Sequence, residues 1–238
     1  MKIMFRFSQE LAYWIGLVQT DGSLVKWTRK NGKIENELHM ETKSEILIKE
    51  FQKGLNLLNR FPKYFKTKRG FFSCKAGVGS ILFQIKTLRL FSAKAKFRAP
   101  NFVLKDKAFF GAYLGGIIDG DGDIRTKNKK YPQCVIRITS GFKQEILMKL
   151  IKEFLICSVT DTKREGKRYL KKENRIINGS WHELEFSISS KNFYFISSFV
   201  VPNIKLPYKK EKISNFIKQK YAAAGNFRQS LLNPGLQT

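Results

Sequence analysis

Two aspartates, Asp21 and Asp121, are the residues of this sequence best suited to metal-dependent chemistry. Each precedes a glycine and ends an apolar stretch that is predicted to be helical. An acid at a helix C-terminus faces the negative end of the helix dipole, and two such acids side by side also repel each other. A cation would offset both effects, and oxygen ligands with a phosphate nearby favour Mg²⁺. We therefore expect Mg²⁺ at Asp21 and Asp121, with the carbonyl oxygens of Thr20 and Gly120 as further ligands, because a helix leaves its last carbonyls unpaired.

Other reactive groups are scarce. The chain has two histidines, His39 and His182, and three cysteines without a Cys-x-x-Cys pair. Zinc fingers, histidine-based triads and a disulfide framework therefore lack their parts. Carboxylates and lysines remain as the groups that could carry chemistry, and no small-molecule cofactor is expected.

The charge of the chain indicates a polyanionic partner. Lys and Arg number 45 against 19 acids, which gives a net charge of +26 over 238 residues. Nucleic acid and an anionic membrane surface both fit such an excess. No run of about 18 apolar residues is present, and the first residues lack the apolar core and cleavage site of a signal peptide. We therefore expect an intracellular protein that binds nucleic acid and has no membrane partner.

The elements that must position the two aspartates are repeated along the chain. Residues 11–24 (LAYWIGLVQTDGSL) align with residues 111–124 (GAYLGGIIDGDGDI) at an offset of one hundred. Each copy is followed by a predicted hairpin, a helix with apolar residues at helical spacing, and a second hairpin. Ser8 and Asp106 are the expected N-caps of the two copied helices. The sequence predicts an α+β fold of two related halves, 1–99 and 108–238, joined by a linker at 100–107.

Small residues predict how the two copied helices meet. Gly16 and Gly116 each follow an alanine by four residues and would let the helix backbones approach closely, with Gly111 and Gly115 beside them. Glycine inside a helix costs about 1 kcal/mol relative to alanine, so contact geometry is expected to require these residues. Helices that cross on a pseudo-twofold axis would bring Asp21 and Asp121 together within a monomer.

Basic residues on the predicted hairpins are expected to bind the nucleic acid. Alternate residues of a strand face the same side, and a two-stranded ribbon fits the major groove of DNA. Contacts of this kind go mostly to phosphates, so binding should fall steeply with salt. The residues expected at DNA are Lys26, Thr28, Lys30, Lys66, Lys68, Arg69, Arg125, Lys127, Lys129, Arg137, Thr139, Lys163, Arg164, Lys167 and Arg168.

The stretches WIGLVQTDG and LGGIIDGDG resemble the two motif copies of the LAGLIDADG family of homing endonucleases, in its single-chain form. The resemblance spans about Gln9 to Tyr221 and departs from the family pattern at Gln19, where the motif usually has the acid that Asp119 retains. It implies an αββαββα fold in each half, with saddle-shaped antiparallel sheets over DNA and packing through the motif helices. It also implies a lysine near each active site. Lys94 and Lys210 are the best matches, followed by Lys96 and Lys212, and a polar residue that ends the second strand points to Thr42 and Ser140.

The resemblance further implies the activity. We expect a site-specific, metal-dependent endonuclease that hydrolyses both strands of a long, non-palindromic double-stranded DNA target, acting as a monomer. Mg²⁺ is the expected ion, with Mn²⁺ as a substitute and Ca²⁺ binding without cleavage. An intron-encoded enzyme of intron mobility fits best, in an organelle (mitochondrion or chloroplast) or a bacterial cytoplasm. An RNA-binding intron maturase and a catalytically inactive DNA-binding protein of the same fold are the alternatives, and the two intact Asp-Gly pairs disfavour the inactive protein.

Overall fold

The computed structural model describes residues 6–90, 97–127, 132–170 and 175–221. The first half contains α1 (Gln9–Asp21), β1 (Gly22–Thr28), β2 (Ile34–Thr42), α2 (Glu45–Leu57), β3 (Tyr64–Lys66), β4 (Phe72–Gly77), η1 (Gly79–Ile81) and α3 (Leu82–Thr87). The second half contains η3 (Val103–Lys105), α4 (Lys107–Asp121), β5 (Gly122–Lys127), β6 (Gln133–Ser140), α5 (Glu145–Leu155), β7 (Val159–Leu170), β8 (Arg175–Ser187), α6 (Phe193–Phe195), η4 (Ile196–Val200), η5 (Val201–Asn203) and α7 (Pro207–Tyr221).

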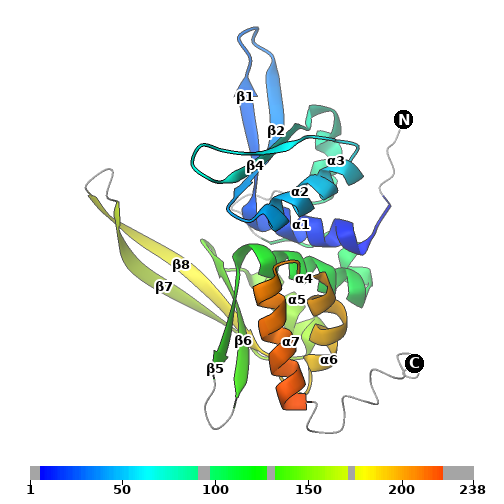
Figure 1. Cartoon of the computed structure of the whole chain (residues 1–238), viewed down its shortest axis with the longest axis vertical. Coiled ribbons are helices and arrows are strands. Elements are labelled where there is room, and N and C mark those ends of the chain that lie inside the picture. Colours follow the sequence, from blue (N-terminus) through cyan, green and yellow to red (C-terminus); the bar gives the residue numbers. More distant parts are fainter. Residues whose placement is uncertain (1–5, 91–96, 128–131, 171–174, 222–238) are drawn as a thin grey trace.

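The two halves have the same sheet topology, so the α+β fold expected from the repeat is confirmed. The strand orders are β1-β2-β4-β3 and β5-β6-β8-β7, and every neighbouring pair is antiparallel. The two halves lie on opposite sides of α1 and α4, which run next to each other through the middle of the molecule (Figure 1).

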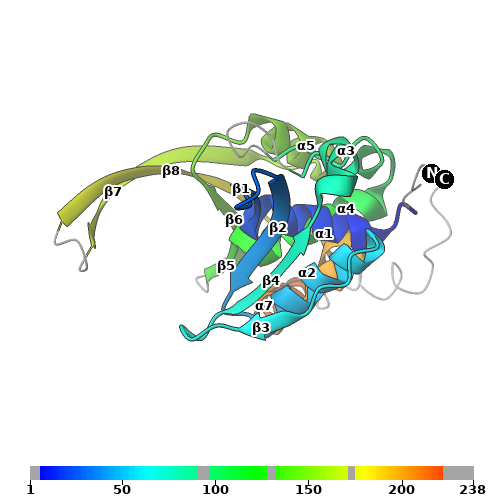
Figure 2. The ribbon, with the colours of Figure 1, turned by 90° about the horizontal axis from the view of Figure 1, so that it is seen from above.

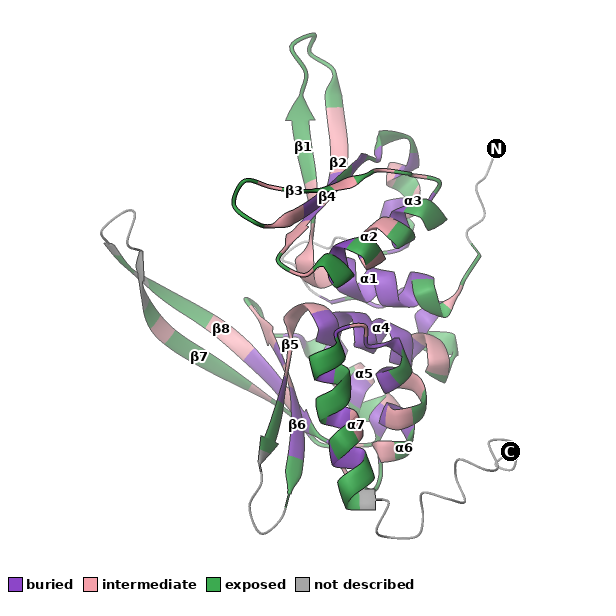
Figure 3. Cartoon of the chain, viewed as in Figure 1, coloured by how far each residue is buried: buried purple, intermediate pink, exposed green. Residues whose placement is uncertain are grey.

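Both central helices begin at the expected caps. The Ser8 side chain accepts a hydrogen bond from the Leu11 amide at 3.2 Å, and the Asp106 carboxylate accepts one from the Ala108 amide at 2.6 Å. Residues 11–18 of α1 and 110–119 of α4 are buried, which matches helices that are apolar on all sides (Figure 3). The core of the molecule is therefore continuous across the seam between the halves.

Glycines bring α1 and α4 into backbone contact at this seam. A Cβ atom added to Gly16 would overlap the carbonyl oxygen of Tyr113, and one added to Gly116 would overlap that of Tyr13. This reciprocal contact is what a pseudo-twofold axis between the helices requires. Gly111 and Gly115 lie elsewhere, because their added Cβ atoms would meet Phe199 and Asn203 on the other side of α4. Close contact is confirmed for Gly16 and Gly116 at the seam and for Gly111 against Phe199, but Gly111 and Gly115 do not contact α1.

The segment expected to link the halves is packed against the molecule. Pro100, Phe102 and Val103 are buried, and α4 already begins at Lys107. Among the helices that the structure describes, none has the length and apolar character needed to cross a membrane.

The second half carries a long arm. Strands β7 and β8 pair from Val159 and Phe186 to Leu170 and Arg175, whereas β6 pairs with β8 only as far as His182. Beyond that point, residues 164–170 and 175–181 form a ribbon that projects away from the body of the protein (Figure 2).

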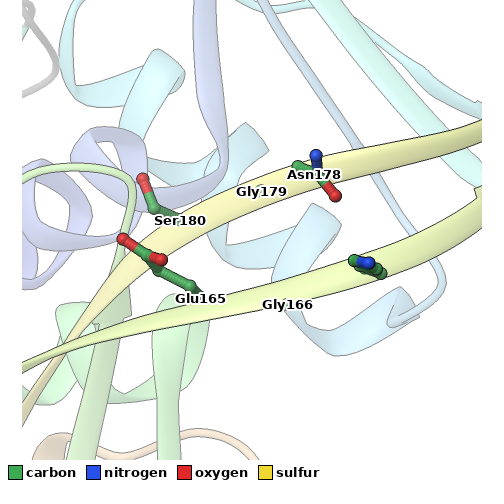
Figure 4. Close-up of a pocket in the computed structure, with 6 residues that line it drawn as sticks. Glu165, Gly166, Asn178, Gly179 and Ser180 are labelled. Carbon is green, nitrogen blue, oxygen red and sulfur yellow. The ribbon is translucent and has the colours of Figure 1, made fainter.

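A hollow on this arm is lined by residues 165–167 and 178–180 (Figure 4). Gly166 and Gly179 face each other across its two strands, and a Cβ atom at Gly166 would lie 2.9 Å from the Trp181 ring. The arm alone forms this hollow, and neither Asp21 nor Asp121 lines it.

Candidate active site

The last turns of α1 and α4 place Asp21 and Asp121 together at the seam. Burial raises the pKa of Asp21, and burial together with the negative charge of Asp21 raises the pKa of Asp121 to about 7. Lys209 opposes both shifts. The two carboxylates are therefore close enough to interact, half-buried and poorly stabilised as anions, which is the condition that a bound cation relieves.

The neighbouring residues Thr20 and Gly120 touch each other. A Cβ atom at Gly120 would overlap the side chain of Thr20, so only glycine allows this approach of the helix ends. The Thr20 hydroxyl donates a 2.7 Å hydrogen bond to the Leu17 carbonyl of its own helix. The groups that these two residues can offer to a cation are their backbone carbonyls, as the sequence predicted.

The donor set fits a hard cation that keeps part of its coordination outside the protein. In the described residues no cluster of three or more His, Cys, Asp or Glu side chains could hold a metal ion. Two carboxylates and helix-end carbonyls match the oxygen ligands of Mg²⁺, which usually retains waters and binds substrate phosphate through its remaining positions.

Among the described residues, Lys209 is the lysine that interacts with both acids. Its side chain is buried, and Nζ donates to the carbonyls of Ile118 and Asp119 at 2.7 and 2.8 Å. Burial lowers the pKa of Lys209, against the opposing charges of Asp119, Asp21 and Asp121. Lys209 thus binds the last turn of α4 and adds a positive charge near the acids.

The lysines expected at the site lie elsewhere or outside the described residues. Lys210 is exposed to solvent on α7, and Lys212 donates to the Ile124 carbonyl at 3.3 Å. Lys94 and Lys96 lie outside the residues that the structure describes. Comparison of the two repeats favoured lysines with a counterpart in the other half, and Lys209 has none, because Ala93 matches it at the offset of 116 that aligns Leu90 with Leu206.

The side chains of Gln19 and Asp119 form hydrogen bonds to the backbone of the segments that follow each sheet, and so hold these segments against α1 and α4. Asp119 accepts hydrogen bonds from the amides of Lys205 and Leu206 at 2.7 and 3.3 Å, just before α7. Gln19 instead donates through Nε2 to the carbonyls of Arg89 and Arg98 at 2.8 and 2.9 Å.

Tyrosines of the opposite helices complete this arrangement. The Tyr13 hydroxyl donates to Asp119 at 2.8 Å, and the Tyr113 hydroxyl donates to the Gln19 Oε1 at 2.6 Å. The described partners of the Asp119 side chain are all hydrogen-bond donors, which suits a carboxylate. The Gln19 side chain faces two carbonyl acceptors as well as a hydroxyl donor, which suits an amide. The departure of Gln19 from the motif follows from the polarity of the backbone that it binds.

The polar residues that end the second strands take part in local turns. The Thr42 Oγ1 accepts from the Ser44 amide at 3.2 Å, and the Ser140 Oγ accepts from the Phe142 amide at 3.3 Å. Gln144 also donates to the Ser140 Oγ at 2.7 Å. Both hydroxyls therefore stabilise the turns before α2 and α5.

Among the described elements, helices cover one face of each sheet and none covers the other (Figure 1). In the second half, Ile124, Ile136 and Leu184 belong to the core and define the covered face. Strand alternation then puts Arg125, Arg137, Thr139 and Arg164 on the uncovered face, as expected for residues that line a groove. By the same alternation Lys163 and Lys167 belong to the side of Val159 and the core. The side chains of Lys127 and Arg168 lie outside the described residues. Lys129 lies outside the described residues.

In the first half the prediction of which strand face carries the DNA-binding residues was wrong. Leu24 pairs with Leu38 and packs on the core, so Lys26 and Thr28 share the covered side of the sheet. Lys30 lies in the exposed turn after β1. The uncovered face carries Val25 and Trp27, which are 40% and 41% exposed, and these two residues were missed.

The remaining basic residues of the first half surround the second hairpin. Lys66 lies over the Phe72 ring at 5.7 Å and Lys68 is exposed in the turn. Arg69 donates to Glu41 at 3.2 Å. Glu41 pairs with Ser73 on the uncovered face, so Arg69 reaches that face from the turn.

Comparison with known proteins finds relatives by structure. No protein-family model matches the sequence, and no curated protein matches it either. The solved structure of I-DmoI with DNA and Ca is 17% identical, with a TM-score of 0.54, over 87% of this chain and 97% of that one. The I-LtrWI LAGLIDADG homing endonuclease bound to target DNA is 16% identical, with a TM-score of 0.54, over 90% and 92%. A variant of I-SmaMI is 13% identical, with a TM-score of 0.53, over 98% and 100%.

Proposed function

We propose that this chain, which has the fold of the LAGLIDADG homing endonucleases, is a divalent-metal-dependent endonuclease that cuts both strands of a specific double-stranded DNA site. The observation that carries the proposal is the meeting of Asp21 and Asp121 at the seam. The negative charge of Asp21 disfavours the anionic form of Asp121, which a cation would offset. Each acid is the last residue of a central helix and directly precedes the first strand of its sheet, in a chain of net charge +26.

The side chains divide the chemistry between them. Asp21 and Asp121, with the carbonyls of Thr20 and Gly120, would hold the cation. A divalent ion at this position supplies Lewis-acid stabilisation of the phosphodiester and a more acidic water. Lys209 supplies a fixed positive charge beside the acids, and the close packing of α1 and α4 keeps the two carboxylates in place.

The two halves are unequal, which supports a non-palindromic target. Lys209 has Ala93 as its counterpart, and the second hairpin is much longer in the second half. One chain contains both halves of the site, so a monomer is sufficient for cutting both strands.

The solved relatives support both the partner and the ion. I-DmoI has been solved in complex with DNA and Mn, and with DNA and Ca, and a variant of I-DmoI has been solved in complex with its target DNA in the presence of Mg. I-LtrWI has been solved bound to its target DNA. We propose Mg²⁺ as the working ion of this chain, with Mn²⁺ as a substitute.

Selection of cleaved sites from a genomic or randomised duplex library, with and without Mg²⁺, tests the proposal. The expected result is one family of related duplexes cut on both strands, with no cleavage when EDTA replaces Mg²⁺. Absence of cut duplexes in Mg²⁺ and Mn²⁺, together with tight binding to a structured intron RNA, would establish the maturase alternative instead.

A further inference from the structure

A cluster of five charged side chains lies on the uncovered face of the second sheet. Arg137 on β6 donates through Nη2 to Asp123 at 2.9 Å and through Nη1 to Glu183 at 2.8 Å. Arg125 on β5 donates through Nε to Asp123 at 3.0 Å, and Arg164 on β7 donates through Nε to Glu183 at 3.3 Å. The cluster therefore runs across all four strands of the sheet, with Arg137 at its centre.

Arg137 is enclosed by its partners. Its side chain is 16% exposed, both terminal nitrogens are bonded to carboxylates, and Nε is buried without an acceptor among the described atoms. Because its side chain is mostly covered and both Nη atoms already bond to acids, Arg137 is less available to a ligand than an exposed arginine. Its role is to fix Asp123 and Glu183, and the Trp181 indole adds a 3.1 Å bond to Glu183.

Arg125 and Arg164 are bound in a different way. Each is held only through Nε, and in the part of the chain that the structure describes no bond from their terminal nitrogens is seen. Their side chains are 49% and 55% exposed. Each guanidinium is thus held at Nε by an acid and keeps its two Nη atoms without a bond to any described residue, on a side chain that is about half exposed.

We propose that Arg125 and Arg164 are the base-reading residues of the second half-site, each recognising one guanine, and that Arg137, Asp123 and Glu183 orient them without contacting bases. The proposal rests on the DNA-binding function proposed above. Guanine presents O6 and N7 as two acceptors in the major groove, which suits a paired donor on a fixed guanidinium. Strands β5 and β7 are three strand spacings of about 4.8 Å apart, so the two arginines are far enough apart for separate base pairs.

The described residues of the first half form no such cluster. The strand registers place Ser23 where the second half has Asp123, Val25 where it has Arg125, and His39 where it has Arg137. His39 lies 3.0 Å from the Ser73 hydroxyl, and no described carboxylate forms a hydrogen bond with it. Guanine preference through such arginines is therefore expected in the second half-site only.

Binding selection from a randomised duplex pool, without added divalent metal, tests the division of roles. The wild-type protein should select two fixed guanines in one half-site. Arg125→Lys and Arg164→Lys keep the positive charge but lose the paired N–H donors of the guanidinium. Each variant should therefore reduce the preference for one of these guanines by at least about fivefold. The salt dependence of binding should stay as in the wild type, since it reports phosphate contacts.

The orienting residues should behave differently from the readers. Asp123→Asn should weaken the preference at the Arg125 position while raising affinity for unrelated duplexes, because a negative charge is removed. Arg137→Met should lower the preference for both guanines and change the base preference at no other position of the site. Lys53→Ala removes a positive charge and an ion pair with Glu50 on α2, and it should change no base preference.

Three results would overturn the proposal. These are a selected site without guanines in either half-site, a uniform loss of affinity with unchanged base preference in both lysine variants, or a third fixed position lost only in Arg137→Met. Thermal melting of each variant confirms that it is folded. A wild-type protein that selects no duplex at all would refute the proposed DNA function itself, and is thus distinguishable from failure of the arginine assignment.

Discussion

Replacing Gly116 by alanine perturbs the closest contact between α1 and α4. The new Cβ atom would overlap the Tyr13 carbonyl oxygen and lie 2.8 Å from the Leu17 amide nitrogen and 3.0 Å from the Tyr13 carbonyl carbon. All three atoms belong to the backbone of α1, so no change of rotamer can make room. The two helices must separate for the variant to fold.

The structure sets the size of this effect. Restoring the Leu17 contact alone to about 3.4 Å moves the helices apart by about 0.6 Å, and the overlap with Tyr13 requires more. Overpacking a buried site typically costs about 1–3 kcal/mol, while alanine gains about 1 kcal/mol over glycine in helix propensity. Because rigid backbone is displaced along a fully buried seam, the upper value applies. We expect the free energy of unfolding to fall by about 2 kcal/mol, which lowers Tm by about 4–8 °C.

Thermal unfolding followed by circular dichroism measures the change. Gly77→Ala in β4 is the matched control, because a Cβ atom there has no neighbour within 4 Å. The control should keep the unfolding free energy within about 0.5 kcal/mol of the wild type. A Gly116→Ala protein that melts at or above the wild-type temperature would refute the close packing of the seam, since helix propensity alone would then decide the outcome.

Three further predictions follow from the site. Folded Asp121 has a pKa of about 7 against 3.8 normally, so between pH 4 and 7 the folded state retains a proton that the unfolded state loses, and stability falls with rising pH. Asp121→Asn should therefore stabilise the metal-free protein at pH 8, by up to about 4 kcal/mol, and leave it unchanged at pH 4, as measured by melting in EDTA. Gln19→Glu places a carboxylate against two carbonyl oxygens, and Asp119→Asn places an amide group against two backbone amides. Each substitution should lower the free energy of unfolding, measured by urea titration, by about 1–3 kcal/mol. A variant as stable as the wild type would contradict the hydrogen bonds described. Affinity for duplex DNA should fall by at least about 10³-fold between 50 and 200 mM salt in fluorescence titrations, and a flat dependence would exclude binding through phosphates.

Sequence patterns were sufficient for the fold because the relevant signals are local. The repeated helix, its caps at Ser8 and Asp106, and the small residues Gly16 and Gly116 each act within a few residues or against an identical partner. The pseudo-twofold arrangement followed from the repeat, and it brought Asp21 and Asp121 together as expected.

The face of a strand could not be predicted in the same way. In β1 the alternation of Lys26 and Thr28 resembles a solvent face and that of Val25 and Trp27 resembles a core face, yet the observed pairing reverses them. The tip of the hairpin extends beyond the helices, so its exposed residues no longer report which face is covered.

The site lysine was missed for a related reason. Lys209 reaches α4 only because Asp119 binds the amides of Lys205 and Leu206 one turn earlier, a contact between residues 86 and 87 positions apart. No periodicity in the sequence encodes a contact of this range, and the absence of a lysine at Ala93 removed the signal that the repeat would have given.

The decisive measurement is cleavage of the selected duplex by Asp21→Asn and Asp121→Asn in Mg²⁺, with binding measured in parallel without metal. The wild-type protein should cut both strands, each variant should cut at least about 100-fold more slowly, and both variants should bind the duplex as tightly as the wild type. Full double-strand cleavage by either variant would show that the acids at the seam of α1 and α4 are not the metal site.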